Sequence, residues 1–117
     1  MSSNELVISR ETAEKILSFR NERNWSQFHN PKDLAISVSL EAAELLECFQ
    51  WSGSDTEVTS KLEAMKEELS DIFIYCILLA DRLKINLDEV IQAKIAKNAE
   101  KYPVEKSFGK SSKYTEI

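Results

Sequence analysis

The chain has 117 residues, and its 20 acidic and 15 basic residues give a net charge of −5 at pH 7. This length is typical of one domain, and the acidic excess argues against binding a nucleic-acid polymer, which needs basic residues. Only two glycines and two prolines occur, too few for the many tight turns of an all-β fold. We therefore predict an all-α fold, a bundle-like subunit of four to five helices. The predicted single domain covers residues 1–117, with 1–8 as an N-terminal arm and 104–117 as an irregular tail.

The first two predicted helices each begin at a residue type that caps helices. Ser9 is the candidate N-cap of a helix over residues 11–23. A loop rich in aromatic residues follows, and Asn30 with Pro31 then marks the start of a second helix that extends to Trp51. These signals predict two helices joined by a short connection.

Two more helices are predicted over residues 55–83 and 87–101. Each follows a capping-box pattern, in which a Ser or Asn precedes a Glu by three residues. The two patterns are Ser54 with Glu57 and Asn86 with Glu89. Pro103 ends the last helix, because proline cannot continue one.

The longest apolar run, residues 72–80, lies in the third predicted helix. Because this run is apolar on every side, we expect it to be buried all round, but a membrane span would need ~20 such residues. The first residues lack the basic and apolar pattern of a secretory signal. Cys48 and Cys76 form no CxxC pair and are expected to be buried, reduced thiols. We therefore expect a cytoplasmic protein without a membrane partner.

Two pairs of carboxylates at three-residue spacing are the main chemical signal. In the second helix, Glu41 and Glu44 form one pair, and Glu41 falls within the apolar stripe at about 100° per residue. Glu44 and Glu47 have the same spacing, but Glu47 lies further from that stripe. In the third helix, Glu68 and Asp71 form the second pair. A carboxylate that faces the core must be paired, hydrogen-bonded or metal-bound.

An antiparallel hairpin of the second and third helices would bring these pairs to one level. Residues 41 and 71 share the midpoint Thr56 with residues 44 and 68, close to the predicted turn. Four carboxylates at one level repel unless cations hold them, and hard oxygen ligands suit Mg²⁺ or Mn²⁺. One alternative is a solvated acidic surface. Another is a helical di-iron site, which is disfavoured because the only histidine, His29, lies in a loop.

The apolar stripe of the fourth helix continues as a cationic strip formed by Lys94, Asn98 and Lys101. Beside a metal and its carboxylates, lysines suit phosphate oxygens, whereas alone they would be solvated residues favoured by the helix dipole. The spacing of the aromatic residues and the histidine does not decide between core packing and stacking on a base. These residues are Trp25, Phe28, His29, Trp51 and Tyr75.

Taken in order, these motifs resemble those of the all-α nucleotide pyrophosphohydrolases of the MazG type, with the dCTP pyrophosphatase branch as the closest likeness. The resemblance covers about residues 9–116. It is carried by Trp25–Pro31, Glu41-x-x-Glu44 with the following residues to Trp51, Glu67–Ile72, Lys94 with Asn98, Lys101–Pro103 and Ser112–Thr115.

The resemblance implies Mg²⁺-dependent hydrolysis of a nucleoside triphosphate, dCTP or a related deoxynucleotide, to the monophosphate and pyrophosphate. The implied metal ligands are Glu41, Glu44, Glu68 and Asp71. Glu44 and Glu41 are the implied catalytic residues, and we expect Glu44 to accept the proton of the attacking water. The residues implied near the phosphates are Lys94, Asn98, Lys101 and Tyr102. Those implied around the base and sugar are His29, Trp25, Phe28, Trp51 and Tyr75.

Self-association is expected on two grounds. Members of the resembled family are usually dimers or tetramers, and a 13.4 kDa chain offers little protein to bury a helix that is apolar all round. A non-catalytic helical oligomer, an adaptor or regulator, would explain that helix equally well. It would not explain why Glu41 faces the core side of its helix.

Overall fold

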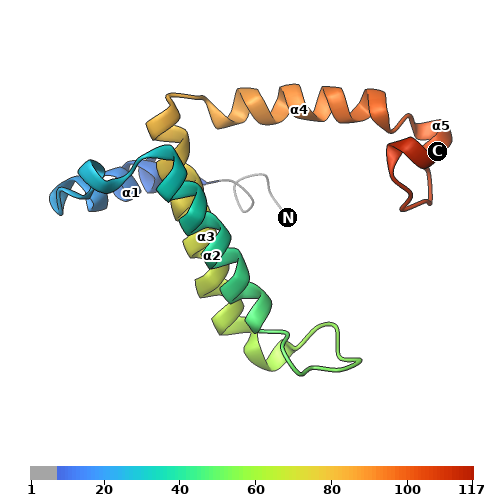
Figure 1. The fold of residues 1–117 in the computed structure, drawn as a ribbon, viewed down its shortest axis with the longest axis horizontal. Helices are drawn as coiled ribbons and strands as arrows, with labels where there is room; N and C mark the ends of the chain where they lie inside the picture. Colours follow the sequence, from blue (N-terminus) through green and yellow to red (C-terminus); the bar gives the residue numbers. More distant parts are fainter. Residues whose placement is uncertain (1–7) are drawn as a thin grey trace. The chain divides into compact units, whose positions relative to one another are not determined.

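The computed structural model of the protein describes residues 8–117, so all but the last residue of the predicted N-terminal arm lies outside it. Within these residues every regular element is a helix and no strand occurs, which confirms the predicted all-α class. The chain divides into two units between Lys84 and Ile85, and each unit is described by itself (Figure 1).

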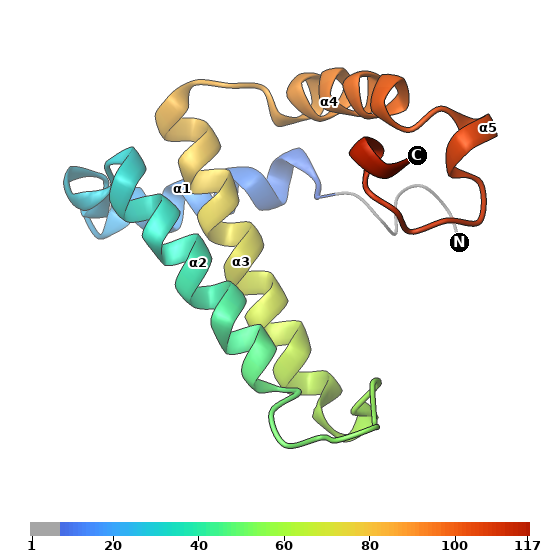
Figure 2. The same ribbon diagram turned by 45° about the vertical axis from the view of Figure 1, so that its right-hand side comes forward.

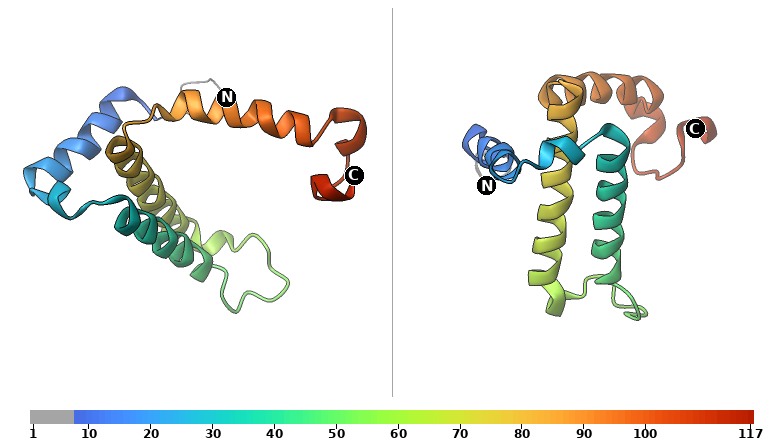
Figure 3. Two further views of the ribbon diagram at one scale, coloured as in Figure 1. Left: turned by 45° about the horizontal axis from the view of Figure 1, so that its top comes forward. Right: turned by 60° about the vertical axis from the view of Figure 1, so that its left-hand side comes forward.

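The first unit is built on an antiparallel hairpin of two long helices, α2 (Pro31–Glu47) and α3 (Leu62–Leu83). The two helices run side by side, as Figures 2 and 3 show, so the predicted hairpin is confirmed. A shorter helix, α1 (Arg10–Glu22), packs against α3. A 3-10 turn, η2 (Trp25–Phe28), lies in the connection from α1 to α2.

Three helices begin at the side chains that the sequence predicts. Ser9, Asn30 and Asn86 each accept a hydrogen bond from the backbone N–H three residues later, at donor–acceptor distances of 3.1, 2.8 and 3.2 Å. Pro31 occupies the first turn of α2, where its missing N–H costs nothing. Each cap satisfies an N–H group that has no partner inside its helix.

The predicted end of the second helix at Trp51 is wrong, because α2 ends at Glu47. The next four residues form turns, and Trp51 has a positive φ of 65°. A non-glycine residue in this left-handed region is uncommon and interrupts a right-handed helix. Trp51 therefore sits on a loop and not on the face of α2.

The predicted start of the third helix after Ser54 is also wrong. The Asp55 carboxylate accepts hydrogen bonds from the backbone N–H groups two and three residues later, both at 3.1 Å. In this turn Asp55 binds backbone N–H groups that would point in other directions if a helix were capped at Ser54. Val58 then adopts a left-handed φ of 45°, and α3 begins at Leu62 after a 3-10 turn, η3 (Thr59–Lys61).

The core of the first unit is small. Its buried hydrophobic residues are Leu34, Cys48, Val58, Leu78 and Ala80. The prediction that residues 72–80 are buried all round is wrong, because Phe73 is 48% exposed and most of the others are half-buried. Within this unit α2 and α1 cover only part of the surface of α3. Cys48 is buried and Cys76 half-buried, and the two form no disulfide, so the predicted burial holds only for Cys48.

The second unit consists of α4 (Leu87–Lys101), a one-turn helix α5 (Val104–Ser107) and a 3-10 turn η4 (Tyr114–Glu116). The helix α4 ends where predicted, but the segment predicted as irregular contains α5 and η4. The Tyr114 ring packs edge-on against Tyr102 with 6.0 Å between ring centres. The Lys101 ammonium lies 5.0 Å from the centre of the Tyr114 ring. These contacts hold η4 against the end of α4.

Within residues 8–117, no helix combines the length and apolarity needed to cross a membrane.

Candidate functional site

Three glutamates converge between the two helices of the hairpin. Glu41 and Glu44 come from α2, Glu68 comes from α3, and one carboxylate oxygen of each lies within 4.8 Å of the others. The three-residue spacing places the first two on one side of α2, and the antiparallel register brings Glu68 to their level. Glu41 and Glu68 are half-buried and Glu44 is exposed. The hairpin therefore carries a carboxylate cluster that is open to solvent on one side.

Mutual repulsion and burial raise the pKa of two carboxyl groups of this cluster, Glu41 and Glu68. Burial, followed by the neighbouring Glu44, raises the pKa of Glu41. A hydrogen-bonded carboxyl pair with Glu44, reinforced by burial, raises the pKa of Glu68 to about 7. The Oε2 atoms of Glu41 and Glu68 are buried and accept no hydrogen bond within residues 8–117. Because the neighbouring groups of the cluster are themselves carboxylates, these oxygens favour a bound proton, water molecule or cation.

Asp71, the fourth predicted ligand, lies beside the cluster and not within it. It follows Glu68 by one helical turn, and its charge contributes to the raised pKa values of Glu41 and Glu68. Asp71 also lines an adjacent pocket. The structure thus groups three of the four predicted carboxylates directly and places the fourth at the boundary with this pocket.

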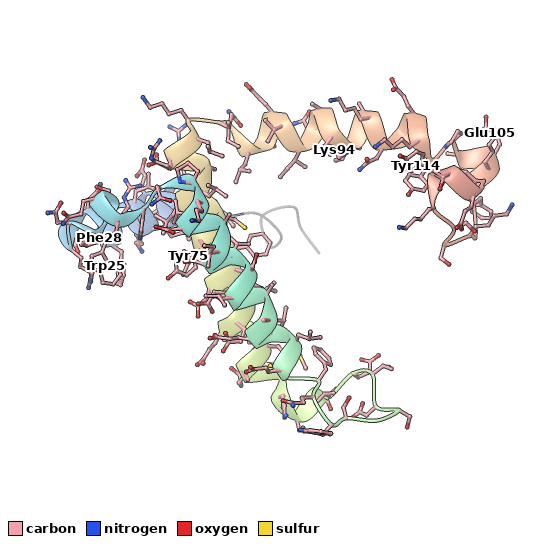
Figure 4. The ribbon with its side chains drawn as sticks, viewed as in Figure 1. Trp25, Phe28, Tyr75, Lys94, Glu105 and Tyr114 are labelled. Atoms are coloured by element: carbon pink, nitrogen blue, oxygen red, sulfur yellow. The ribbon has the colours of Figure 1, made fainter. Side chains whose placement is uncertain are left out.

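The pocket has a volume of about 530 Å³ and lies between α1, the segment around η2, and α3. Most of its lining side chains are apolar. It is lined by Ile8, Thr12, Lys15, Ile16, Phe19, Arg20, Trp25, His29, Ser70, Asp71, Phe73, Ile74, Tyr75 and Leu78. Three predicted base-binding residues, Trp25, His29 and Tyr75, therefore line one pocket. Trp25 and Tyr75 are labelled in Figure 4. An apolar cavity with a few polar groups is the usual form of a small-molecule site.

Aromatic and cationic side chains pack against one another beside the pocket, near the end of α1. The Phe19 and Trp25 rings meet edge to face with 5.8 Å between centres, and the Arg23 guanidinium lies 3.6 Å from the centre of the Phe19 ring. Arg20 forms an ion pair with Asp81 of α3, with 2.7 Å between Nη1 and Oδ2. Burial, followed by the charge of Arg20, lowers the pKa of His29. His29 is therefore neutral at pH 7.

Two predicted base-binding residues lie outside this pocket. Phe28 is 63% exposed. Trp51 is 92% exposed and follows the far end of α2, whose 17 residues span about 25 Å. The hairpin loop lies at the end opposite to α1 and η2 in Figure 2. Trp51 therefore cannot reach the pocket of its own first unit.

The predicted phosphate-binding residues all belong to the second unit. Lys94, labelled in Figure 4, and Asn98 are exposed on α4, Lys101 is its last residue, and Tyr102 is its C-cap. Among the residues that line the pocket, the sequence analysis had named only Trp25, His29, Asp71 and Tyr75 as site residues, and it missed Phe19 and Arg20 of α1 among others. Their signal is the spacing of residues 12, 16, 19 and 20, which places one face of α1 against the pocket.

Fold and site together define an all-α protein with a half-buried carboxylate cluster beside an apolar pocket. A family model described as the MazG-like family matches residues 36–117. The chain therefore belongs to the MazG-like family.

Several mammalian proteins named dCTP pyrophosphatase 1 are similar to most of the chain. The dCTP pyrophosphatase 1 of Mus musculus is 40% identical over 105 residues, which are 85% of this chain and 61% of the relative. The human protein of that name is 36% identical over 104 residues, which are 85% of this chain and 61% of the relative. The chain thus spans about 61% of the length of these relatives. A crystal structure of a pyrophosphatase from Archaeoglobus fulgidus has a TM-score of 0.73 and 42% identity, covering 80% of this chain and 90% of the other.

Proposed function

We propose that the protein hydrolyses a deoxynucleoside triphosphate, dCTP or a close relative, to the monophosphate and pyrophosphate. The observation that carries the proposal is the cluster of Glu41, Glu44 and Glu68 beside a pocket of about 530 Å³. The cluster supplies negative charge that must be neutralised, and the pocket supplies room and aromatic surface for a base. The names of the relatives, dCTP pyrophosphatase 1 and a pyrophosphatase, support this chemistry.

The carboxylate cluster fits a divalent cation. Two buried oxygens, Glu41 Oε2 and Glu68 Oε2, accept no hydrogen bond within residues 8–117, and all nearby donor atoms are hard carboxylate oxygens. This chemistry favours Mg²⁺, with Mn²⁺ as the next candidate. Glu41, Glu44 and Glu68 would hold the ion, with Asp71 as the fourth ligand. When bound, the ion supplies positive charge that offsets the charge of the triphosphate.

Glu44 is the proposed general base. It is the exposed member of the cluster, so a water molecule can reach its carboxylate, whereas Glu41 is half-buried and acts as a catalytic partner in the same cluster. Water attacks the α-phosphorus, Glu44 takes the proton, and the bond from that phosphorus to the bridging oxygen of pyrophosphate breaks. Lys94, Asn98, Lys101 and Tyr102 are proposed to contact the phosphates.

We also propose that the pocket holds the base and sugar. Trp25 and Tyr75 offer aromatic faces, and neutral His29 offers a hydrogen-bonding edge. Phe28 and Trp51 lie outside the pocket of this chain, and the 92% exposure of Trp51 leaves it available to a neighbouring subunit.

Homo-oligomerisation, as a dimer or tetramer, is part of the same proposal. Large apolar side chains remain exposed on α2 and α4. They are Ile36, Leu40 and Leu46 on α2, and Val90, Ile91 and Ile95 on α4. A second copy that covers such faces would bury apolar surface and complete a small core. We further propose that residues 1–117 act as one domain, since the family match runs across both units.

Product analysis tests this proposal. The protein is incubated with Mg²⁺ and each of the common dNTPs, and the products are separated by ion-exchange chromatography. The expected products from dCTP are dCMP and pyrophosphate. Formation of dCDP and phosphate, or no turnover of any nucleotide, would refute the proposed reaction.

A matched pair of variants tests the assigned carboxylates. Glu41→Gln removes a half-buried member of the cluster and is expected to lower kcat by at least about a hundredfold. Glu47→Gln removes an exposed carboxylate from the same helix and should leave kcat near the wild-type value. Equal rates for Glu41→Gln and wild type would exclude the cluster as the reaction centre.

A further inference from the structure

One charged side chain of the apolar pocket has no part in the proposed reaction. Arg20, in the last turn of α1, lines the pocket and is only 12% exposed. Its Nη1 donates to Asp81 Oδ2 at 2.7 Å, and its Nε donates to Asn21 Oδ1 at 3.0 Å. A guanidinium has five N–H groups, so Nη2 and one hydrogen of Nη1 have no acceptor within residues 8–117. Arg20 is thus held in place while several of its N–H groups remain without an acceptor within residues 8–117.

Arg20 is anchored at the end of the pocket away from the carboxylate cluster. Along α3 the pocket extends from Asp71 to Leu78, and Asp81 lies almost one further turn along. The ten residues from Asp71 to Asp81 correspond to about 15 Å of helix. A nucleotide whose phosphates lie at the cluster would therefore direct its base toward Arg20. The charge of Arg20 also acts on His29 at this end.

The guanidinium fork distinguishes bases by their pattern of acceptors. Two parallel N–H groups match two neighbouring acceptor atoms, as in the contact of arginine with O6 and N7 of guanine. Among pyrimidines, cytosine presents such a pair in O2 and N3. Uracil and thymine carry a hydrogen on N3, which would face the arginine donors.

We propose that Arg20 is a specificity-determining residue, which selects cytosine nucleotides by donating hydrogen bonds to O2 and N3 of the base. The inference rests on the proposed function, because it takes the pocket as the base site of that reaction. Asp81 has a positioning role, since its carboxylate orients the guanidinium. Cytosine is favoured over guanine because the relatives are named as dCTP pyrophosphatases.

Arg20→Lys and Arg20→Gln test the proposal. Lysine keeps a positive charge opposite Asp81 but lacks the planar fork, so the fold should be retained while base recognition is lost. The ratio of kcat/KM for dCTP to that for dUTP is expected to fall roughly ten- to a hundredfold in both variants. A purely structural role of the ion pair predicts that both nucleotides lose activity together and in step with Tm. Arg82→Gln removes an exposed arginine next to Asp81 and should leave the ratio unchanged.

Binding of the monophosphates by calorimetry gives a second readout that needs no turnover. Wild type is expected to bind dCMP more tightly than dUMP, and Arg20→Lys should remove that preference. If this holds while no triphosphate is hydrolysed, the proposed function fails and the recognition role stands. An unchanged dCTP to dUTP ratio in both variants, or a selective loss of dGTP turnover, would overturn the role of Arg20 in reading cytosine.

Discussion

The raised pKa of Glu68 makes the proposed metal site sensitive to pH. The Glu68 carboxyl has a pKa of about 7, mainly because it shares a hydrogen bond with Glu44 and is partly buried. A carboxylate must lose its proton before it binds a cation. Protons and Mg²⁺ therefore compete for the cluster in the range where most carboxylates are fully ionised.

The size of the effect follows from this pKa. With a pKa of about 7, about 9% of the group is ionised at pH 6 and about 91% at pH 8. If one proton must leave for each ion bound, the apparent affinity for Mg²⁺ rises about tenfold between pH 6 and pH 8. The glutamates interact, so the titration belongs to the cluster as a whole. A second displaced proton, from Glu41, would make the rise steeper.

Calorimetry measures both the affinity and the number of protons released. Titration of Mg²⁺ at pH 6, 7 and 8, in buffers of different ionisation enthalpy, should give about one released proton at pH 6 and almost none at pH 8. Glu68→Gln should bind Mg²⁺ more weakly and lose most of the pH dependence. Glu63→Gln, in the first turn of the same helix, serves as the matched control because Glu63 is exposed and lies outside the cluster. An affinity that does not change between pH 6 and pH 8 would refute the raised pKa and the cation site built on it.

The stability of the metal-free protein should depend on pH in the opposite sense. Because folding raises the pKa of Glu41 and Glu68 above 4.5, their contribution is fully present below pH 4.5 and declines as pH rises, and the part due to Glu68 is lost as pH passes through about 7. Thermal unfolding with EDTA should show this decline, and added Mg²⁺ should reduce it; a Tm that rises over this range in EDTA would contradict the prediction. Leu34→Ala removes a side chain that is 1% exposed and should cost about 2–5 kcal/mol in urea unfolding. Leu46→Ala, on the exposed side of the same helix, should cost far less, and equal losses would mean that Leu34 is not part of the core.

The sequence predicted the elements whose signals are local. The caps Ser9, Asn30 and Asn86 use their own side chains on backbone groups three residues away, so residue type and spacing were sufficient. The meeting of Glu41, Glu44 and Glu68 also followed from local periods, because an antiparallel hairpin with its midpoint near Thr56 places residues 41, 44 and 68 at one level. In each case the prediction needed only the chain within one element or across one connection.

The connection between α2 and α3 was less predictable, because two local signals compete there. Ser54 with Glu57 has the pattern of a capping box, but Asp55 reaches the same stretch of backbone and forms a turn. Asx turns and helix caps use the same residue types. Sequence spacing alone therefore does not decide which of the two forms.

The pocket required contacts that no local pattern contains. Arg20 and Asp81 are 61 positions apart, and their ion pair is one of the contacts between α1 and α3 that close the pocket. The spacing of residues 12, 16, 19 and 20 gives α1 a face, but it does not say which helix that face meets. Trp51 shows the same limit, since the family resemblance implied a base contact, whereas the structure places Trp51 on a loop away from the pocket of its own chain. Trp25 and His29 are in the pocket because η2 lies between α1 and α2, whereas Trp51 follows the far end of α2. A base site that includes both tryptophans therefore requires a second copy of the chain.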